Sequence, residues 1–173
     1  MEILKGAGVP KGSFYYFFSS KDAFGEALLS EYFRAYHEDM DVLFSKHGLS
    51  MAEKLMVYWA GWREHQLAFD FQGRCLAVKL GAEVSDLSEP MREALERGTS
   101  GVIARLSVAI EHGVAEGSVL TARPFRQVAE SLYSLWLGAS VMAKIERSGR
   151  PFDTALATTR EMLGIVIGSA LAA

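Results

Sequence analysis

The chain has 173 residues, of which half are hydrophobic and 23% are charged, and its net charge at pH 7 is −3. This length and composition suit one domain, or a small module joined to a larger one, and exclude an intrinsically disordered chain. The negative balance argues against a general polyanion-binding protein, so any nucleic-acid surface must be local.

Apolar residues recur at helical spacing along nearly the whole chain, and no segment shows sustained strand-like alternation. Glycine, proline and polar turn residues interrupt this pattern at six places. Ser20 and Ser88 stand where helices begin, so we expect both to cap them, and Pro90 suits a first turn. The sequence therefore predicts an all-α fold with helices over residues 1–7, 10–17, 20–44, 50–67, 74–84, 89–116, 124–147 and 152–171.

A helix, a tight turn and a second short helix begin the chain, which is the layout of a helix-turn-helix DNA reader. Gly6 and Gly8 end the first helix, and Pro10 begins the second, where proline is tolerated. Three aromatic residues of the second helix fall on one side and are predicted to pack inward. They are Phe14, Phe17 and Phe18.

Lysine, hydroxyl and phenol groups lie elsewhere on the same helix, and such groups bind phosphate oxygens and base edges. Lys11, Ser13, Tyr15 and Tyr16 carry them. Lys21 follows in the first turn of the next helix, where free backbone N–H groups also favour a phosphate. From spacing alone, a packed helical hairpin with solvated lysines is an equal alternative.

Three segments carry a resemblance to a known family. "AGVPKGSFYYFFSSKDAF" resembles the recognition-helix region of TetR-family transcriptional regulators. "CLAVKLGAEVSDLSEPMREAL" and "LYSLWLGASVMAKIERS" are similar to the NemR-type, electrophile-responsive branch of that family. The resemblance spans residues 3 to about 162. It implies a homodimeric repressor with a partial DNA-binding domain at 1–24, whose first helix is missing from this sequence, and a helical sensing and dimerisation domain at 25–173.

The resemblance also implies which residues contact operator DNA. Those that match the family motif are Lys11, Gly12, Ser13, Tyr15, Tyr16 and Lys21. Two positions depart from it, because Phe17 replaces a common tyrosine and Tyr16 a common histidine. We therefore expect an operator preference of its own. With Met1 inside the segment that resembles the second helix, DNA binding by the chain as given is itself an open question.

Cys75, the single cysteine, begins the predicted helix at 74–84. A thiol in the first turn of a helix feels the positive end of the helix dipole, which predicts a lowered pKa and a reactive thiolate. The resemblance implies a sensor of electrophiles and oxidants at this position, with Lys144 as a neighbouring cation. The alternatives are a buried, inert thiol and a solvated lysine.

Large aromatic residues recur at helical spacing on two segments and are predicted to line a ligand pocket or to fill the core. They are Tyr58, Trp59, Trp62, Tyr133 and Trp136. The last two long helices carry more than one apolar face, which favours a two-fold dimer interface between them. Its predicted residues are Leu135, Gly138, Ala139, Met142, Leu156, Thr159, Leu163, Val166 and Ile167.

The four histidines show no metal-ligand spacing, and no catalytic constellation stands out, so we expect neither an enzyme nor a cofactor. A single cysteine, the lack of a signal-peptide pattern and the short apolar stretch at 163–173 predict a cytoplasmic protein without a membrane partner. Two functions remain beside electrophile sensing. One is a TetR-family regulator released by reversible binding of a small unsaturated acid or another ligand. The other is a helical binding or dimerisation module that no longer binds DNA.

Overall fold

The computed structural model describes residues 6, 8, 10–71 and 75–165, without the side chains of 11 and 69–71. Within these residues the chain forms seven α-helices and no strand, which confirms the predicted all-α class. The helices are α2 (Lys11–Phe17), α3 (Lys21–Ser45), α4 (Met51–Phe71), α5 (Leu76–Leu87), α6 (Glu89–Ala115), α7 (Phe125–Glu146) and α8 (Arg150–Met162). The predicted helix at 1–7 lies outside the described residues.

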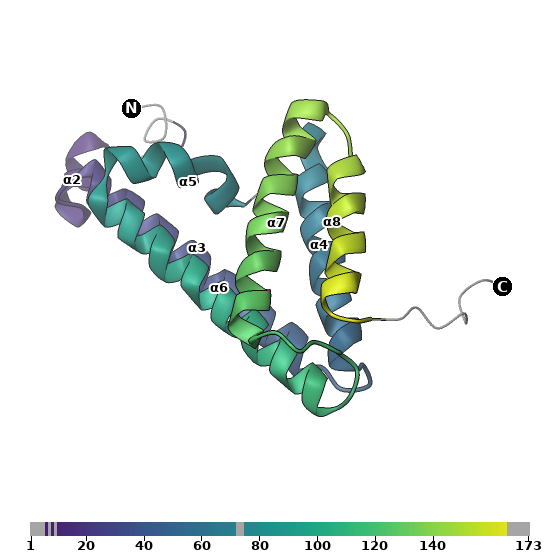
Figure 1. Ribbon diagram of the computed structural model, residues 1–173. Helices are drawn as coiled ribbons and strands as arrows, with labels where there is room; N and C mark the ends of the chain where they lie inside the picture. Colours follow the sequence, from purple (N-terminus) through teal and green to yellow (C-terminus); the bar gives the residue numbers. More distant parts are fainter. Residues whose placement is uncertain (1–5, 7, 9, 72–74, 166–173) are drawn as a thin grey trace.

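Two long helices, α3 and α6, lie side by side and form the spine of the molecule (Figure 1). At one end of this spine are α2 and α5, and at the other end α4, α7 and α8 pack together. The close approach of α3 and α6 depends on Gly98, because a Cβ there would lie 2.1 Å from the Phe33 ring. A displacement of α3 therefore passes directly to α6.

Aromatic stacking fills the core between α4, α7 and α8. The rings of Trp59 and Trp136 are fully buried and stack with centroids 4.8 Å apart. Phe152 of α8 stacks on the other side of Trp136, at 5.8 Å. The Trp136 N–H donates a hydrogen bond of 2.9 Å to the Thr159 hydroxyl, which pins α8 to α7. These aromatic residues make the second half of the chain one packed unit.

The helix ends match the sequence prediction in part. Ser20 caps α3 as expected, since its hydroxyl accepts a hydrogen bond of 3.0 Å from the Ala23 N–H. Ser88 lies at the start of α6 but forms no cap, and its buried hydroxyl has no partner in the described structure. The prediction that Ser88 caps α6 is therefore wrong.

The last helix is shorter than predicted. It ends at Met162 instead of 171, because the chain turns at Gly164 with a φ of +57°. The carbonyl of Leu163 then accepts a hydrogen bond of 2.8 Å from the Leu120 N–H, which ties this turn to the α6–α7 connection. The remaining predicted helical residues, 166–171, lie outside the described residues. In the described part of the chain, none of the helices combines the length and apolarity needed to cross a bilayer.

Candidate functional site

The predicted DNA-contacting residues form an exposed surface on α2 and the start of α3. Tyr16 is 84% exposed and Tyr15 46%, and Gly12, Ser13 and Lys21 are also exposed. Lys11 begins α2, but its side chain lies outside the description. Because these groups sit at the end of the molecule remote from α7 and α8, they are accessible to a large partner (Figure 1).

The aromatic side of α2 is smaller than the sequence predicted. Phe14 and Phe18 pack on Phe24 of α3, with ring centroids 5.4 and 5.0 Å apart. Phe17, by contrast, is 74% exposed, so the prediction that it packs inward is wrong. A seven-residue helix that rests on α3 has one narrow contact face, and Phe17 lies off that face.

A cavity of about 520 Å³ opens between α3, α4 and the start of α5. Its lining combines aromatic and aliphatic walls with a few polar groups, which is typical of small-molecule sites. The lining residues are Tyr32, Tyr36, Asp39, Met40, Leu43, Val57, Tyr58, Gly61, Trp62, His65, Gln66 and Cys75. Of the five predicted pocket residues, the cavity includes Tyr58 and Trp62.

The other three predicted pocket residues belong to the core. Trp59 and Trp136 stack on each other away from the cavity, and Tyr133 packs edge-on against Trp62 at 5.7 Å. The Trp62 N–H donates a hydrogen bond of 3.0 Å to the Ser140 hydroxyl, which fixes the indole as a wall. The core alternative is therefore correct for Trp59, Tyr133 and Trp136.

Polar groups of the cavity differ in how well they are paired. The hydroxyls of Tyr36 and Tyr58 hydrogen-bond to each other at 2.9 Å. Gln66 is only 6% exposed, and its amide makes no hydrogen bond within the described structure. Asp39 and His65 are exposed and therefore lie at the mouth. The cavity thus has a buried, unpaired amide inside and a carboxylate at its entrance.

Cys75 is half-buried at the N-cap position of α5 and lines the cavity. Burial raises the pKa of its thiol above the usual range, and this outweighs the lowering influence of the Val78 N–H, the Tyr32 hydroxyl and the Ala77 N–H. The predicted lowering of the pKa is therefore wrong in direction. Desolvation disfavours the thiolate more than the helix N-terminus stabilises it.

Four phenols surround this thiol: those of Tyr32, Tyr36, Tyr58 and Tyr133. Burial raises the pKa of each, and ionisation of the nearby Cys75 would raise it further. The phenols are therefore neutral at physiological pH, and they present hydroxyl groups around the sulfur.

Lys144 is half-buried on α7, and within the described structure it is not among the groups that shift the pKa of Cys75. The two arginines that we weighed as carboxylate partners are occupied elsewhere. Arg63 lies 3.4 Å from Asp153, and Arg105 forms an ion pair of 2.8 Å with Asp41. Neither arginine lines the cavity.

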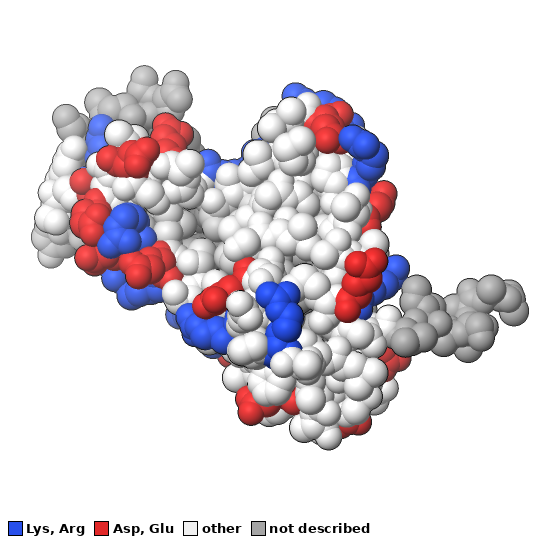
Figure 2. Space-filling model, in the orientation of Figure 1, with Lys and Arg blue, Asp and Glu red and all other residues white. Residues whose placement is uncertain are grey.

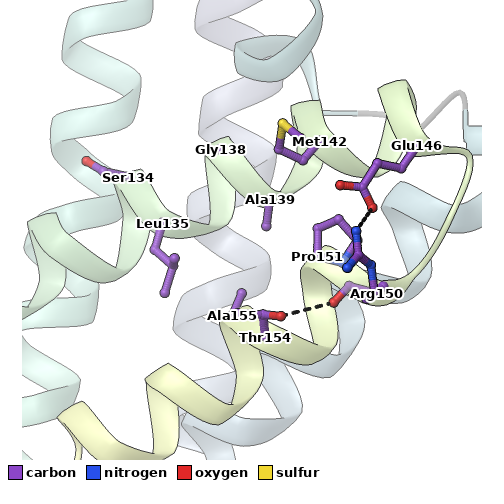
Figure 3. A pocket seen from close by; sticks show the side chains of 10 residues that line it. All are labelled: Ser134, Leu135, Gly138, Ala139, Met142, Glu146, Arg150, Pro151, Thr154 and Ala155. Atoms are coloured by element: carbon purple, nitrogen blue, oxygen red, sulfur yellow. Dashed lines mark hydrogen bonds and ion pairs between the residues drawn. The ribbon is translucent and has the colours of Figure 1, made fainter.

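A second hollow, of about 430 Å³, runs between α7 and α8. Figure 3 shows Leu135, Ala139 and Met142 of α7 along this groove, opposite Pro151 and Ala155 of α8. An ion pair of 3.0 Å between Arg150 and Glu146 closes one end. In Figure 2 the middle of this face carries few charged side chains.

The predicted dimer residues separate into two groups. Leu135, Gly138, Ala139 and Met142 line the groove, and Met142 is 44% exposed. Thr159 and Leu163 are fully buried within the chain and Leu156 is half-buried, while Val166 and Ile167 lie outside the described residues. Exposed apolar side chains continue the face along α7, namely Val141 and Ile145.

Sequence reasoning missed four cavity residues: Tyr32, Tyr36, Asp39 and Gln66. A signal was present, because Tyr58, Trp62 and Gln66 recur every four residues and so share one helix face. Tyr32 and Tyr36 have the same spacing on the facing helix. We did not extend the aromatic stripe to Gln66, since a glutamine is usually exposed.

Comparison with known proteins agrees with this arrangement. Residues 51–159 match the family model described as "Tetracyclin repressor-like, C-terminal domain". The chain is 43% identical over 164 residues to the HTH-type transcriptional repressor NemR of Escherichia coli, covering 94% of this chain and 81% of that protein. It is 32% identical to the HTH-type transcriptional repressor DhaR of Mycobacterium sp., covering 94% and 80%.

Solved structures give the same result. The crystal structure of reduced E. coli NemR superposes with a TM-score of 0.84 and covers 94% of this chain and 84% of that one. A regulatory protein TetR from Rhodobacter sphaeroides superposes equally well, at 0.84 and 29% identity, covering 93% and 85%. These relatives are transcriptional regulators, not enzymes. The chain therefore belongs to the TetR family of transcriptional regulators and is a repressor similar to NemR.

Proposed function

We propose that this repressor binds operator DNA through α2 and the start of α3, and that modification of Cys75 releases it. In this proposal residues 1–24 are part of the DNA-binding domain, and 25–173 form the sensing and dimerisation domain. The modification is alkylation by a reactive electrophile or oxidation of the thiol to the sulfenic acid. One observation carries the proposal: the only thiol of the chain lines a cavity at the joint between α4 and α5.

The position of Cys75 supports a mechanical link to the DNA-binding surface. It begins α5, α5 packs against α6, and α6 packs along α3, which follows directly after α2. An adduct on a half-buried thiol needs space, so α5 must shift or the cavity must repack. To move a population from 99% bound to 99% released, the adduct must favour the released state by about 5.5 kcal/mol.

The dimer is the second part of the proposal. The weakly charged face of α7 and α8, with Val141, Met142 and Ile145 exposed, suits a two-fold contact with a second copy. Such a dimer presents two copies of α2 to successive turns of the DNA, roughly 34–36 Å apart. A change in this separation weakens both half-site contacts at once.

Two observations favour a second candidate, in which a ligand releases the repressor reversibly and Cys75 is inert. Burial raises the pKa of the thiol, and the unpaired amide of Gln66 lacks a partner that a ligand would supply. A module that does not bind DNA is the third possibility. Lys144 stays a prediction, since the proposal needs only Cys75.

Fluorescence anisotropy tests all three. Full-length protein is titrated onto DNA from upstream of its own gene at fixed salt, before and after treatment with N-ethylmaleimide. We expect the reagent to release the native protein but not the Cys75→Ser variant. If both stay bound, reversible ligand binding replaces covalent sensing. If neither binds this DNA, and Lys21→Gln changes nothing, the module without DNA binding is correct.

A further inference from the structure

We propose that the cavity beside Cys75 selects uncharged ligands that carry an amide or carbonyl group and discriminates against carboxylates. In this assignment Gln66 hydrogen-bonds the ligand, and Asp39 at the entrance repels a negative charge. The inference deepens the proposed function, since it names the class of effector that the same cavity admits.

Gln66 is the group that points to a ligand. Its amide is 94% buried without a hydrogen bond in the described structure, and an unpaired buried amide is costly. The other polar groups deep in the lining have partners. The Tyr36 and Tyr58 hydroxyls bind each other, and the Trp62 N–H binds Ser140. The site therefore offers one donor and one acceptor together, which an amide or carbonyl group satisfies.

The charges around the cavity argue against an anionic ligand. Asp39 contributes a carboxylate, and the described lining holds no lysine or arginine. The phenols of Tyr32, Tyr36 and Tyr58 stay neutral and cannot replace a cation, but they repel no neutral ligand either. A carboxylate that entered would lose hydration without gaining an ion pair. A small unsaturated acid, one of the effectors we considered, is therefore disfavoured.

Cavity size and thiol position complete the class. About 520 Å³ holds a ring-sized ligand, and the Trp62 and Tyr32 rings suit a flat, unsaturated one. With an unsaturated carbonyl compound, Cys75 Sγ forms a bond to the β-carbon and the carbon–carbon π bond breaks. The thiol proton ends on the α-carbon, so the addition needs no oxidant or reductant.

A matched pair of maleimides tests the charge selection. N-ethylmaleimide and N-(2-carboxyethyl)maleimide differ by one carboxylate, and each second-order rate constant is divided by that for N-acetylcysteine. One cysteine makes the mass spectrum unambiguous. We expect the neutral reagent to react at least tenfold faster after normalisation. Asp39→Asn should speed the anionic reagent about fivefold, which corresponds to about 1 kcal/mol of repulsion. Glu38→Gln, which removes an exposed carboxylate outside the lining, should change neither rate.

A non-covalent pair tests Gln66 independently of the thiol. In Cys75→Ser, binding of benzamide and benzoate is followed by quenching of tryptophan fluorescence. We expect benzamide to bind more tightly, and Gln66→Leu to weaken it about fivefold without lowering the melting temperature. Gln127→Leu, on an exposed position of α7, is the matched control.

The outcomes separate the two proposals. Equal normalised rates for the two maleimides, or tighter binding of benzoate, overturn the selection and leave covalent sensing intact. A large fall in melting temperature for Gln66→Leu also overturns it, because the amide would then have a structural partner. If Cys75 reacts with neither maleimide while benzamide binds, covalent sensing fails and the selection stands.

Discussion

The reactivity of Cys75 should increase steeply with pH and reach no plateau near neutrality. Burial raises the pKa of this thiol above its usual range, and the thiolate is the nucleophile. The rate constant for alkylation is therefore proportional to a small thiolate fraction. It should rise tenfold per pH unit from pH 6.5 to 8.5.

The burial of Cys75 sets an upper limit on that fraction. A thiol with an ordinary pKa near 8.5 is about 3% ionised at pH 7. Cys75 must lie below this value, whereas a thiol activated by a helix N-terminus has a pKa of about 3.5–7.5 and is largely ionised at pH 7.5. The two explanations differ by more than an order of magnitude in rate at neutral pH.

Iodoacetamide is the suitable reagent, with the adduct followed by mass spectrometry and N-acetylcysteine as the reference thiol. Tyr32→Phe removes a hydroxyl that lowers the pKa of Cys75, so the variant should react more slowly at pH 8. A plateau below pH 8 for the native protein would refute the reasoning from burial and restore the dipole-activated thiolate.

Two substitutions test the helical frame by urea denaturation. Ser20→Ala should destabilise the protein by about 1 kcal/mol through loss of the α3 cap, while Ser19→Ala, which removes an exposed hydroxyl that caps nothing, should not. Gly98→Ala should destabilise it by about 1–3 kcal/mol, because the new methyl group meets the Phe33 ring at 2.1 Å. Gly81→Ala has open space around its new methyl group and should stabilise α5 by about 0.5–1 kcal/mol. Equal stability of Gly98→Ala and the native protein would show that α3 and α6 can separate at little cost.

Much of the fold follows from the sequence because helix signals are local. Apolar spacing located the long helices, and the serine before Lys21 marked the start of α3. Ser88 has the same local signal and forms no cap, since the structure buries its hydroxyl without a partner. The shorter α8 depends on a hydrogen bond between Leu163 and Leu120, which are far apart in the sequence.

The candidate site was predictable only in part, because it depends on which side chains meet. The aromatic stripe on α4 was visible, but spacing could not show that Trp59 faces the core and Trp62 the cavity. The pKa of Cys75 was predicted in the wrong direction, since the helix dipole is a local effect and burial by Tyr32 and its neighbours is a tertiary one. The unpaired amide of Gln66 is likewise invisible until α3 and α4 are placed together.

The central claim is that a modification of Cys75 releases the operator. It is tested most directly by following adduct mass and DNA anisotropy in the same sample at several N-ethylmaleimide concentrations. The account predicts that the anisotropy falls at the rate at which the Cys75 adduct forms, and that Cys75→Ser stays bound throughout. Complete alkylation of Cys75 with the DNA still bound would contradict it.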